Sequence, residues 1–324
     1  MEFPRRQFLP VAAGAAAVLV GSRMAGAETY PSRPVHLIVG FPPALAPDIF
    51  ARVAAQSLSE RLGQQVVVDN RPGAASNIAT EFVVRAVPDG YTLLLASNPN
   101  ALNATLFQNL SFNFIRDIAP VASIARTSLV VTVNPSVPTD TIPEFIAYAK
   151  AHPGEVNMAS GGIGTTVHLA SELFKSMAGI DLVHVPYRGN NLLQDMLSGR
   201  MQVTFAPIPS VISYIRAGTL RALGVTSTGP VDALPGIPPV AKFVPDFEAS
   251  TWFGIGAPKR TPADIVDKLN KEVSASLDDP KMRARLVDLG ALPTSMTPAE
   301  FGQFIAEQTE KWGKVIRGAN IKLG

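Results

Sequence analysis

The regular alternation of short apolar runs with amphipathic stretches constrains the fold of this chain more than any other feature. The first run, Val35–Val39, ends at Phe41-Pro42-Pro43, and helical apolar spacing follows it from Pro47 until Gly63. Short apolar runs are typical of strands buried on both faces, whereas a 3.6-residue spacing indicates amphipathic helices. Their repetition predicts an α/β fold whose parallel sheets are covered by helices on both faces.

The alternation falls into two series, which predict two lobes. Strands are expected at 35–39, 65–68 and 91–96 in the first series, and at 129–133, 156–159, 182–185, 203–205 and 222–225 in the second. Helices are expected at 47–62, 79–87, 142–151, 166–178, 191–198 and 209–217. A closing strand at 250–255 follows, and then helices capped at Thr261-Pro262 and Thr297-Pro298. These last elements could either extend the second lobe or return to complete the first.

The N-terminal segment 1–27 has the three parts of a secretory signal peptide. Arg5-Arg6 forms its charged region, residues 8–20 its apolar region, and Ala25-Gly26-Ala27 its small-residue cleavage site. The apolar region is shorter than the roughly 20 residues that a membrane-spanning helix needs. The arginine pair also fits a twin-arginine signal, so the sequence leaves the Sec and twin-arginine routes open.

The charge balance and the absence of cysteine exclude several classes of protein. The chain carries 28 basic and 26 acidic side chains, and residues 1–27 hold three of the basic and one of the acidic ones, so 25 of each remain. A neutral mature chain argues against nucleic-acid binding, which requires a basic excess. Without cysteine there is no disulfide, no thiolate metal site and no site for a lipid anchor. We expect an exported protein without a lipid anchor.

Motifs for catalysis and metal binding are missing from the sequence. It contains no G-x-S-x-G elbow and no Walker A loop, and its four histidines show no metal-ligand spacing. His36 and His184 lie within apolar strands, so we expect packed core histidines. These features favour recognition over turnover, and we expect no enzyme.

One glycine-rich loop, Ser160–Thr166, lies between an expected strand and an expected helix. Its three glycines would allow close approach of a ligand, and the amides at a helix N-terminus attract an anion. The dinucleotide fingerprint G-x-G-x-x-G is not matched, because Val167 takes the place of its last glycine. The alternative is a tight turn with a threonine N-cap.

Two further loops also follow strand C-termini, where ligands bind in open α/β sheets. The loop Phe41–Asp48 is the first; Asp48 could instead support the first turn of its helix, and Phe41 could belong to the core. The loop Val185–Gly189 is the second, in which Arg188 could pair with a carboxylate or remain a solvated surface residue.

The order and spacing of several motifs across the mature chain resemble the Bug family, the extracytoplasmic solute receptors of tripartite tricarboxylate transporters. These motifs are Tyr30–Val35, Phe41-Pro42-Pro43 with Asp48, Val68–Ala74, Pro88–Leu93, Ser160–Thr165 with His168-Leu169, Val185–Gly189, Arg221–Thr226, Trp252-Phe253-Gly254 and Lys311-Trp312.

The resemblance implies a fold like the type II periplasmic binding proteins, with two α/β lobes joined by two crossing strands and a ligand cleft between them. Lobe one would be 28–127 plus 250–324, and lobe two 128–249. The implied function is capture of a small carboxylate in the periplasm and delivery to membrane permease subunits, without a cofactor or metal. We expect a monomer. The candidate ligand-binding residues are Phe41, Pro43, Ala44, Leu45, Asp48, Ser97, Asn98, Ser160, Gly161, Gly164, Thr165, Tyr187, Arg188 and Ala206.

Departures from the family pattern fall mainly on the first-lobe loops. Ala44-Leu45 replaces a usual Gly-Gly pair, Ala75-Ser76 replaces further glycines, Ala206 stands where an acidic residue is frequent, and the segment after Gly189 is one residue shorter. We expect a more apolar pocket and an aromatic or monocarboxylate ligand; drift in an orphan receptor is the alternative. A ligand sensor that docks on a receptor kinase, or an exported enzyme with a convergent acid–base set, would also fit a two-lobe fold.

Overall fold

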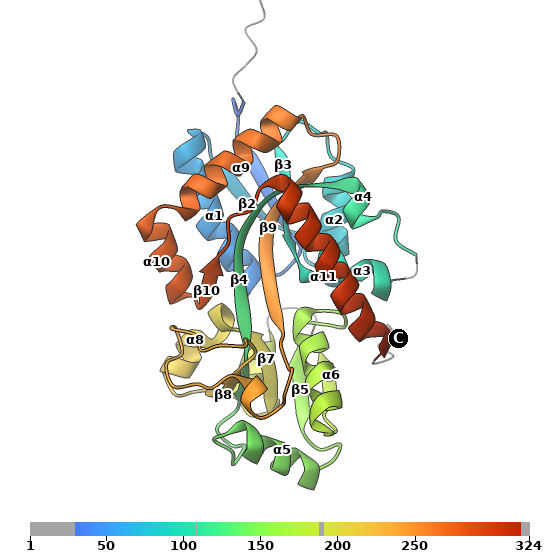
Figure 1. The fold of residues 1–324 in the computed structure, drawn as a ribbon, viewed down its shortest axis with the longest axis vertical. Helices are drawn as coiled ribbons and strands as arrows, with labels where there is room; N and C mark the ends of the chain where they lie inside the picture. The colour runs from blue at the N-terminus through green and yellow to red at the C-terminus, as the bar shows by residue number, and fades with distance from the viewer. Residues whose placement is uncertain (1–29, 108, 188–190, 319–324) are drawn as a thin grey trace, which may run out of the picture.

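The computed structural model describes residues 30–107, 109–187 and 191–318 and shows two α/β lobes stacked along the long axis of the molecule (Figure 1). The predicted signal peptide lies outside these residues. The strands are β1 Val35–Val39, β2 Val66–Asn70, β3 Thr92–Ser97, β4 Ile118–Val133, β5 Asn157–Ser160, β6 Val183–Pro186, β7 Val203–Pro207, β8 Arg221–Val225, β9 Ser250–Pro258 and β10 Ala291–Pro293.

Helices follow most of these strands. They are α1 Ala46–Leu62, α2 Asn77–Val84, α3 Asn98–Leu106, α4 Phe114–Asp117, α5 Ile142–Ala151, α6 Thr166–Ala178, α7 Asn191–Leu197, α8 Ile208–Arg216, α9 Ala263–Leu277, α10 Pro280–Asp288 and α11 Pro298–Gly318, with short 3-10 turns η1 Ala74–Ser76 and η2 Val240–Lys242. No helix among the described residues is long and apolar enough to cross a membrane.

The sheet is mixed, with the strand order β2-β1-β3-β9-β4-β7-β5-β6. We call the part built on β1, β2, β3, β9 and β10 lobe one, and the part built on β5, β6, β7 and β8 lobe two. The prediction of parallel pairing is correct for β1 with β2 and β3, and for β5 with β6 and β7. It is wrong for β9 and β4, which run antiparallel to their neighbours because the chain changes lobes along them.

The lobes are joined where β4 passes from one to the other. Its first part pairs with β9 as far as Ser128, and from Leu129 it pairs with β7. The returning chain lies beside it, since Ser250 at the start of β9 pairs with Ser128 of β4. Just before β9, Ala249 N donates to Thr226 O of lobe two at 3.0 Å. β9 then pairs with β3 and β4, so the closing strand returns to lobe one. The domain limits at 127/128 and 249/250 stay a prediction.

Each lobe has its own apolar core. Leu37, Phe50 and Phe253 belong to the lobe-one core, and Phe174 and Phe205 to the lobe-two core. α11 contributes to both sides: its first half packs with lobe one, while its second half packs with the core of lobe two. α11 therefore reaches across the junction of the lobes (Figure 1).

Several element ends differ from the sequence prediction. The fourth strand begins at Ile118 rather than Leu129, and the helix Asn98–Leu106 was not predicted. α2 ends at Val84, before the predicted limit. The N-cap of α9 is Pro262, and the hydroxyl of Thr261 has no hydrogen-bond partner among the described residues. The N-cap at Thr297 is confirmed, because Thr297 Oγ1 accepts from Glu300 N at 3.3 Å.

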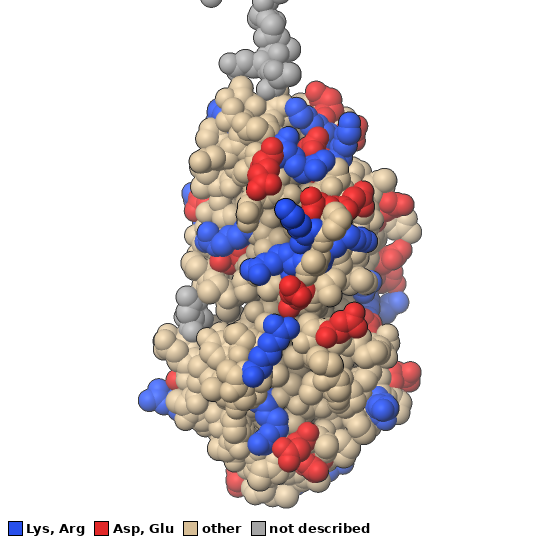
Figure 2. Space-filling view, turned by 90° about the vertical axis from the view of Figure 1, so that its left-hand side faces the viewer, with Lys and Arg blue, Asp and Glu red and all other residues tan. Residues whose placement is uncertain are grey.

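Charge is finely mixed on the face that contains α1, α8 and α10. Figure 2 shows basic and acidic side chains side by side on lobe one, and fewer, more widely spaced charges of both signs on lobe two. This distribution accords with the balanced composition of the chain. Attraction of a charged ligand must therefore come from local groups rather than from a broad field.

Candidate functional site

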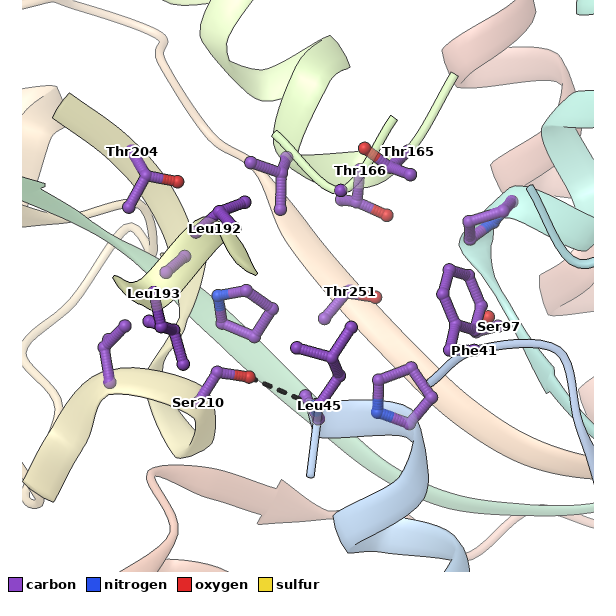
Figure 3. A pocket seen from close by; sticks show the side chains of 18 of the residues that line it. Phe41, Leu45, Ser97, Thr165, Thr166, Leu192, Leu193, Thr204, Ser210 and Thr251 are labelled. Atoms are coloured by element: carbon purple, nitrogen blue, oxygen red, sulfur yellow. Dashed lines mark hydrogen bonds between the residues drawn. The ribbon is translucent and has the colours of Figure 1, made fainter. Parts of the chain in front are cut away.

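A cavity of about 100 Å³ lies between the two lobes and is the candidate ligand site. Its wall comes from the N-terminal ends of α1 and α6, from α7, and from the ends of β3, β7 and β9 (Figure 3). The lining residues are Phe41, Leu45, Ala46, Pro47, Ser97, Pro99, Gly161, Thr165, Thr166, Val167, Leu192, Leu193, Thr204, Ala206, Pro207, Ser210, Val211, Thr251 and Phe253. None of these residues is charged. No group of described residues could hold a metal ion.

The polar side of the cavity is the N-terminus of α6. Thr165 is its N-cap: its Oγ1 accepts from His168 N at 3.4 Å and donates to Gly162 O at 2.8 Å. The first amides of the helix, at Thr166 and Val167, have no intrahelical acceptor. Together with the helix dipole they form an environment that favours an anion.

The hydroxyl of Thr166 adds a donor to this side. The residue is 6% exposed, and its hydroxyl makes no hydrogen bond among the described residues. Figure 3 shows the side chain directed into the space between α6 and α1. A hydroxyl without a protein partner, on a residue that is otherwise largely buried, is suited to bind a ligand oxygen.

Two histidines support the glycine-bearing loop from behind. His168 Nδ1 accepts from Gly164 N at 3.2 Å, and His184 Nε2 lies 2.6 Å from Ser160 Oγ. Their rings are stacked with centroids 4.0 Å apart. Burial lowers the pKa of His168 to about 3 and that of His184 to about 4, so both rings are neutral at pH 7. The expectation of a buried His36 is wrong, because that residue is exposed on β1.

The lobe-one loop Phe41–Asp48 is held by a different network. Asp48 Oδ2 accepts from Ala44 N and from Arg52 Nε, both at 2.9 Å, and Oδ1 accepts from Asn70 Nδ2 at 3.0 Å. Burial raises the pKa of the Asp48 carboxyl, but these hydrogen bonds outweigh it and lower the pKa overall. Asp48 therefore fixes the loop, and it does not line the cavity.

The Ala44-Leu45 pair, where the family resemblance implies glycines, takes two different backbone conformations. Ala44 has φ = 66°, the left-handed region that glycine favours. Leu45 has φ = −83° and is the N-cap of α1, so its side chain is free to line the cavity without backbone strain. Of the two substitutions, only the one at Ala44 places a side chain in a left-handed conformation.

The structure brings six of the fourteen candidate residues together around the cavity: Phe41, Leu45, Ser97, Gly161, Thr165 and Ala206. Arg188 lies outside the described residues. The other seven stand outside the lining: Pro43, Ala44, Asp48, Asn98, Ser160, Gly164 and Tyr187. Some of these have clear structural partners.

Asn98 joins α3 to β9, because its Nδ2 donates to Ser250 O at 2.9 Å and its Oδ1 accepts from Trp252 N at 3.1 Å. Tyr187 donates its hydroxyl to Asp195 at 2.6 Å. Both side chains are thus engaged away from the cavity.

Sequence reasoning missed much of the apolar wall. Leu192 and Leu193 come from α7, Pro207 ends β7, and Val211 belongs to the first turns of α8. The signal that could have found the β7–α8 residues is the strand C-terminus rule that selected the other loops. Thr251 and Phe253 carry no such signal, because they lie near the start of β9 and not after the C-terminus of a strand.

Comparison with known proteins identifies the family. Residues 50–321 match the model of the tripartite tricarboxylate transporter family receptor. BugT of Bordetella pertussis (strain Tohama I) is 36% identical over 301 residues, which cover 92% of each chain.

Two solved structures share the fold along their whole length. R. palustris Rpa4515 with adipate has a TM-score of 0.88 at 33% identity, covering 90% of this chain and 99% of that one. MatC from Rhodopseudomonas palustris with bound malate has a TM-score of 0.83 at 28% identity, covering 89% and 100%. The chain therefore belongs to the solute receptor family of the tripartite tricarboxylate transporters, which includes the Bug proteins.

Proposed function

We propose that this protein binds a small monocarboxylate with an apolar or aromatic tail between its lobes and delivers it to membrane permease subunits without chemical turnover. The observation that carries the proposal is the asymmetry of the cavity. One side offers the amides of α6 and the Thr166 hydroxyl, and the rest of the lining includes Leu45, Leu193 and Val211.

The similar structures support the carboxylate part of this proposal, since they contain adipate and malate. Both of those ligands carry two carboxylates. Among the described residues of this chain, no charged or amide side chain lines the cavity, and Ala206 contributes only a methyl group. A second carboxylate would have to be buried beside Leu45, Leu193 and Val211, with only hydroxyl groups such as those of Ser97 and Thr251 as side-chain donors, at a high desolvation cost.

Export and oligomeric state complete the proposal. We expect residues 1–27 to direct the chain to the periplasm and to be removed there, which N-terminal sequencing of the secreted protein would measure. We expect the mature chain to be a monomer by light scattering. A dimer, or a retained N-terminus, would contradict these expectations.

A thermal-shift panel tests the proposed ligand class. Hexanoate, benzoate and phenylacetate should raise the melting temperature, because a ligand that binds only the folded state at 100 times its Kd adds about 2.7 kcal/mol of stability. Malate, citrate and glutamate should shift it least. A larger shift with citrate or glutamate than with any monocarboxylate would overturn the proposal, and consumption of a stabilising ligand would indicate an enzyme instead.

A further inference from the structure

The N-terminus of α1 lacks a cap from its own segment. The N-cap residue is Leu45, whose side chain has no hydrogen-bonding atom, and Pro47 in the first turn has no amide hydrogen. The Asp48 carboxylate reaches back to Ala44 N and not to the amide of Ala46. The Ala46 amide must therefore find its acceptor elsewhere.

That acceptor comes from the other lobe. Ala46 N donates to Ser210 Oγ at 3.1 Å, across 164 positions of sequence, and the bond is drawn in Figure 3 beside Leu45. Ser210 lies in the first turn of α8, directly after β7 of lobe two. A side chain of lobe two thus caps a helix of lobe one at the edge of the cavity.

Burial makes this bond sensitive to the distance between the lobes. Ala46 is 1% exposed, and in the described part of the chain its amide has no acceptor besides Ser210. An amide buried without a partner is costly, whereas an amide that faces water in a parted cleft is satisfied. The hydroxyl therefore favours the closed arrangement specifically.

We propose that Ser210 is a positioning residue that latches the two lobes together by capping α1 from the opposite side of the cleft. The latch extends the proposed function, since hinge closure is the motion by which a two-lobe receptor encloses its ligand. The proposed contact between Ser210 and α1 does not depend on which ligand binds. Its test can therefore be done on the ligand-free protein, and its failure would leave the proposed ligand class untouched.

The experiment measures the populations of closed and parted lobes by double electron–electron resonance. The chain has no cysteine, so Ala217→Cys beside α8 and Ala284→Cys on α10 place two spin labels at exposed positions on opposite lobes. In this labelled background Ser210→Ala should lower the ratio of short-distance to long-distance populations about tenfold. Alanine keeps α8 intact, because it is the strongest helix former.

Two variants separate the latch from a general effect on α8. Ser210→Thr keeps the hydroxyl and should restore most of the closed population. Ser213→Ala, one turn further along the same helix at an exposed position whose side chain makes no hydrogen bond among the described residues, should leave the ratio unchanged. Circular dichroism melts of each variant check that the fold is retained.

Three results would overturn the proposal. They are an unchanged ratio in Ser210→Ala, an equal loss in Ser213→Ala, and a parent protein without a measurable short-distance population. A loss in Ser210→Ala that Ser210→Thr reverses supports it.

Discussion

The two loops that face each other across the cleft each precede a helix whose first amides lack intrahelical acceptors, and they satisfy those amides in opposite ways. The lobe-two loop Ser160–Thr166 has its own N-cap and two neutral histidines behind it, and it leaves the first amides of α6 and the Thr166 hydroxyl unused. In the lobe-one loop Phe41–Asp48 the polar groups bind one another through the Asp48 carboxylate. The helix that follows this loop, α1, is capped by Ser210 from across the cleft. We therefore propose that lobe two carries ligand recognition, while the lobe-one loop supplies rigidity and the helix end that Ser210 caps.

The largest expected effect comes from removing the centre of the lobe-one network. Asp48→Ala should lower the free energy of unfolding by about 2–3 kcal/mol, because three donors lose a buried charged acceptor. Urea unfolding of the ligand-free protein measures it. Asp69→Ala is the matched control: Asp69 also pairs with an arginine, but its side chain is 37% exposed, so about 0.5 kcal/mol is expected. Equal losses of unfolding free energy in the two variants would show that Asp48 does not stabilise the lobe-one loop more than an exposed ion pair would.

The lobe-two side should respond in affinity rather than stability. Thr166→Val keeps the shape and removes the unused hydroxyl, so hexanoate should bind about tenfold more weakly while the unfolding midpoint stays within error. In Thr132→Val, at a buried position outside the cavity lining, the lost hydroxyl donates to Val130 O at 3.1 Å, so stability should fall and affinity should not. If Thr166→Val binds hexanoate as the parent does, the carboxylate lies elsewhere.

Acid should weaken the fold through the histidines behind the lobe-two loop. Their folded pKa values, about 3 for His168 and about 4 for His184, lie below the unfolded value near 6.5. The unfolded chain therefore takes up protons first, and the contribution of the two neutral rings is complete above pH 6.5 and is lost progressively as the pH falls toward 4 for His184 and 3 for His168.

The lowered pKa of His168 alone can change the free energy of unfolding by at most about 1.4 kcal/mol per pH unit. The measurement is the free energy of unfolding between pH 7.5 and pH 4.5, as set by buffer. The double variant His168→Gln/His184→Gln should show a shallower decline than the parent. The same slope in both proteins would mean that these rings are not kept neutral by the fold.

The smallest expected effect is an increase in stability, in contrast to the losses predicted above. Ala44 has φ = 66°, so Ala44→Gly should stabilise the protein by about 0.5–1 kcal/mol. Ala284→Gly, at an exposed helical position in α10, should instead destabilise it by about 1 kcal/mol. A loss of stability in both variants would show that Ala44 is not strained.

Local sequence patterns predict the limits of elements that are determined by their own residues. β1 was predicted to the residue, and the end of α1 at Gly63 follows from a left-handed C-cap. β4 was truncated in the prediction because Pro120 and polar residues interrupt its first part, and only pairing with β9 makes that part a strand. The α/β class could be predicted, whereas the antiparallel crossing could not, because it depends on tertiary pairing.

The candidate site shows the same limit. Gly161 and Thr165 were predicted because a glycine-bearing strand–helix turn is visible in sequence, and both line the cavity. The motif that contains Asp48 predicts a site residue, but whether its carboxylate faces a ligand or its own loop depends on Asn70 and Arg52. Ser210 carries no local signal, because its partner is 164 residues away.

The most direct test of the account compares two ligands that differ by one carboxylate. Isothermal titration of the mature protein with hexanoate and with adipate holds the chain length constant and changes only the far end of the ligand. Hexanoate should bind at least about tenfold more tightly, because the described lining offers a second carboxylate only hydroxyl groups and apolar side chains and no charged or amide side chain. Tighter binding of adipate would contradict the account, since it would require a second anion site in the cleft.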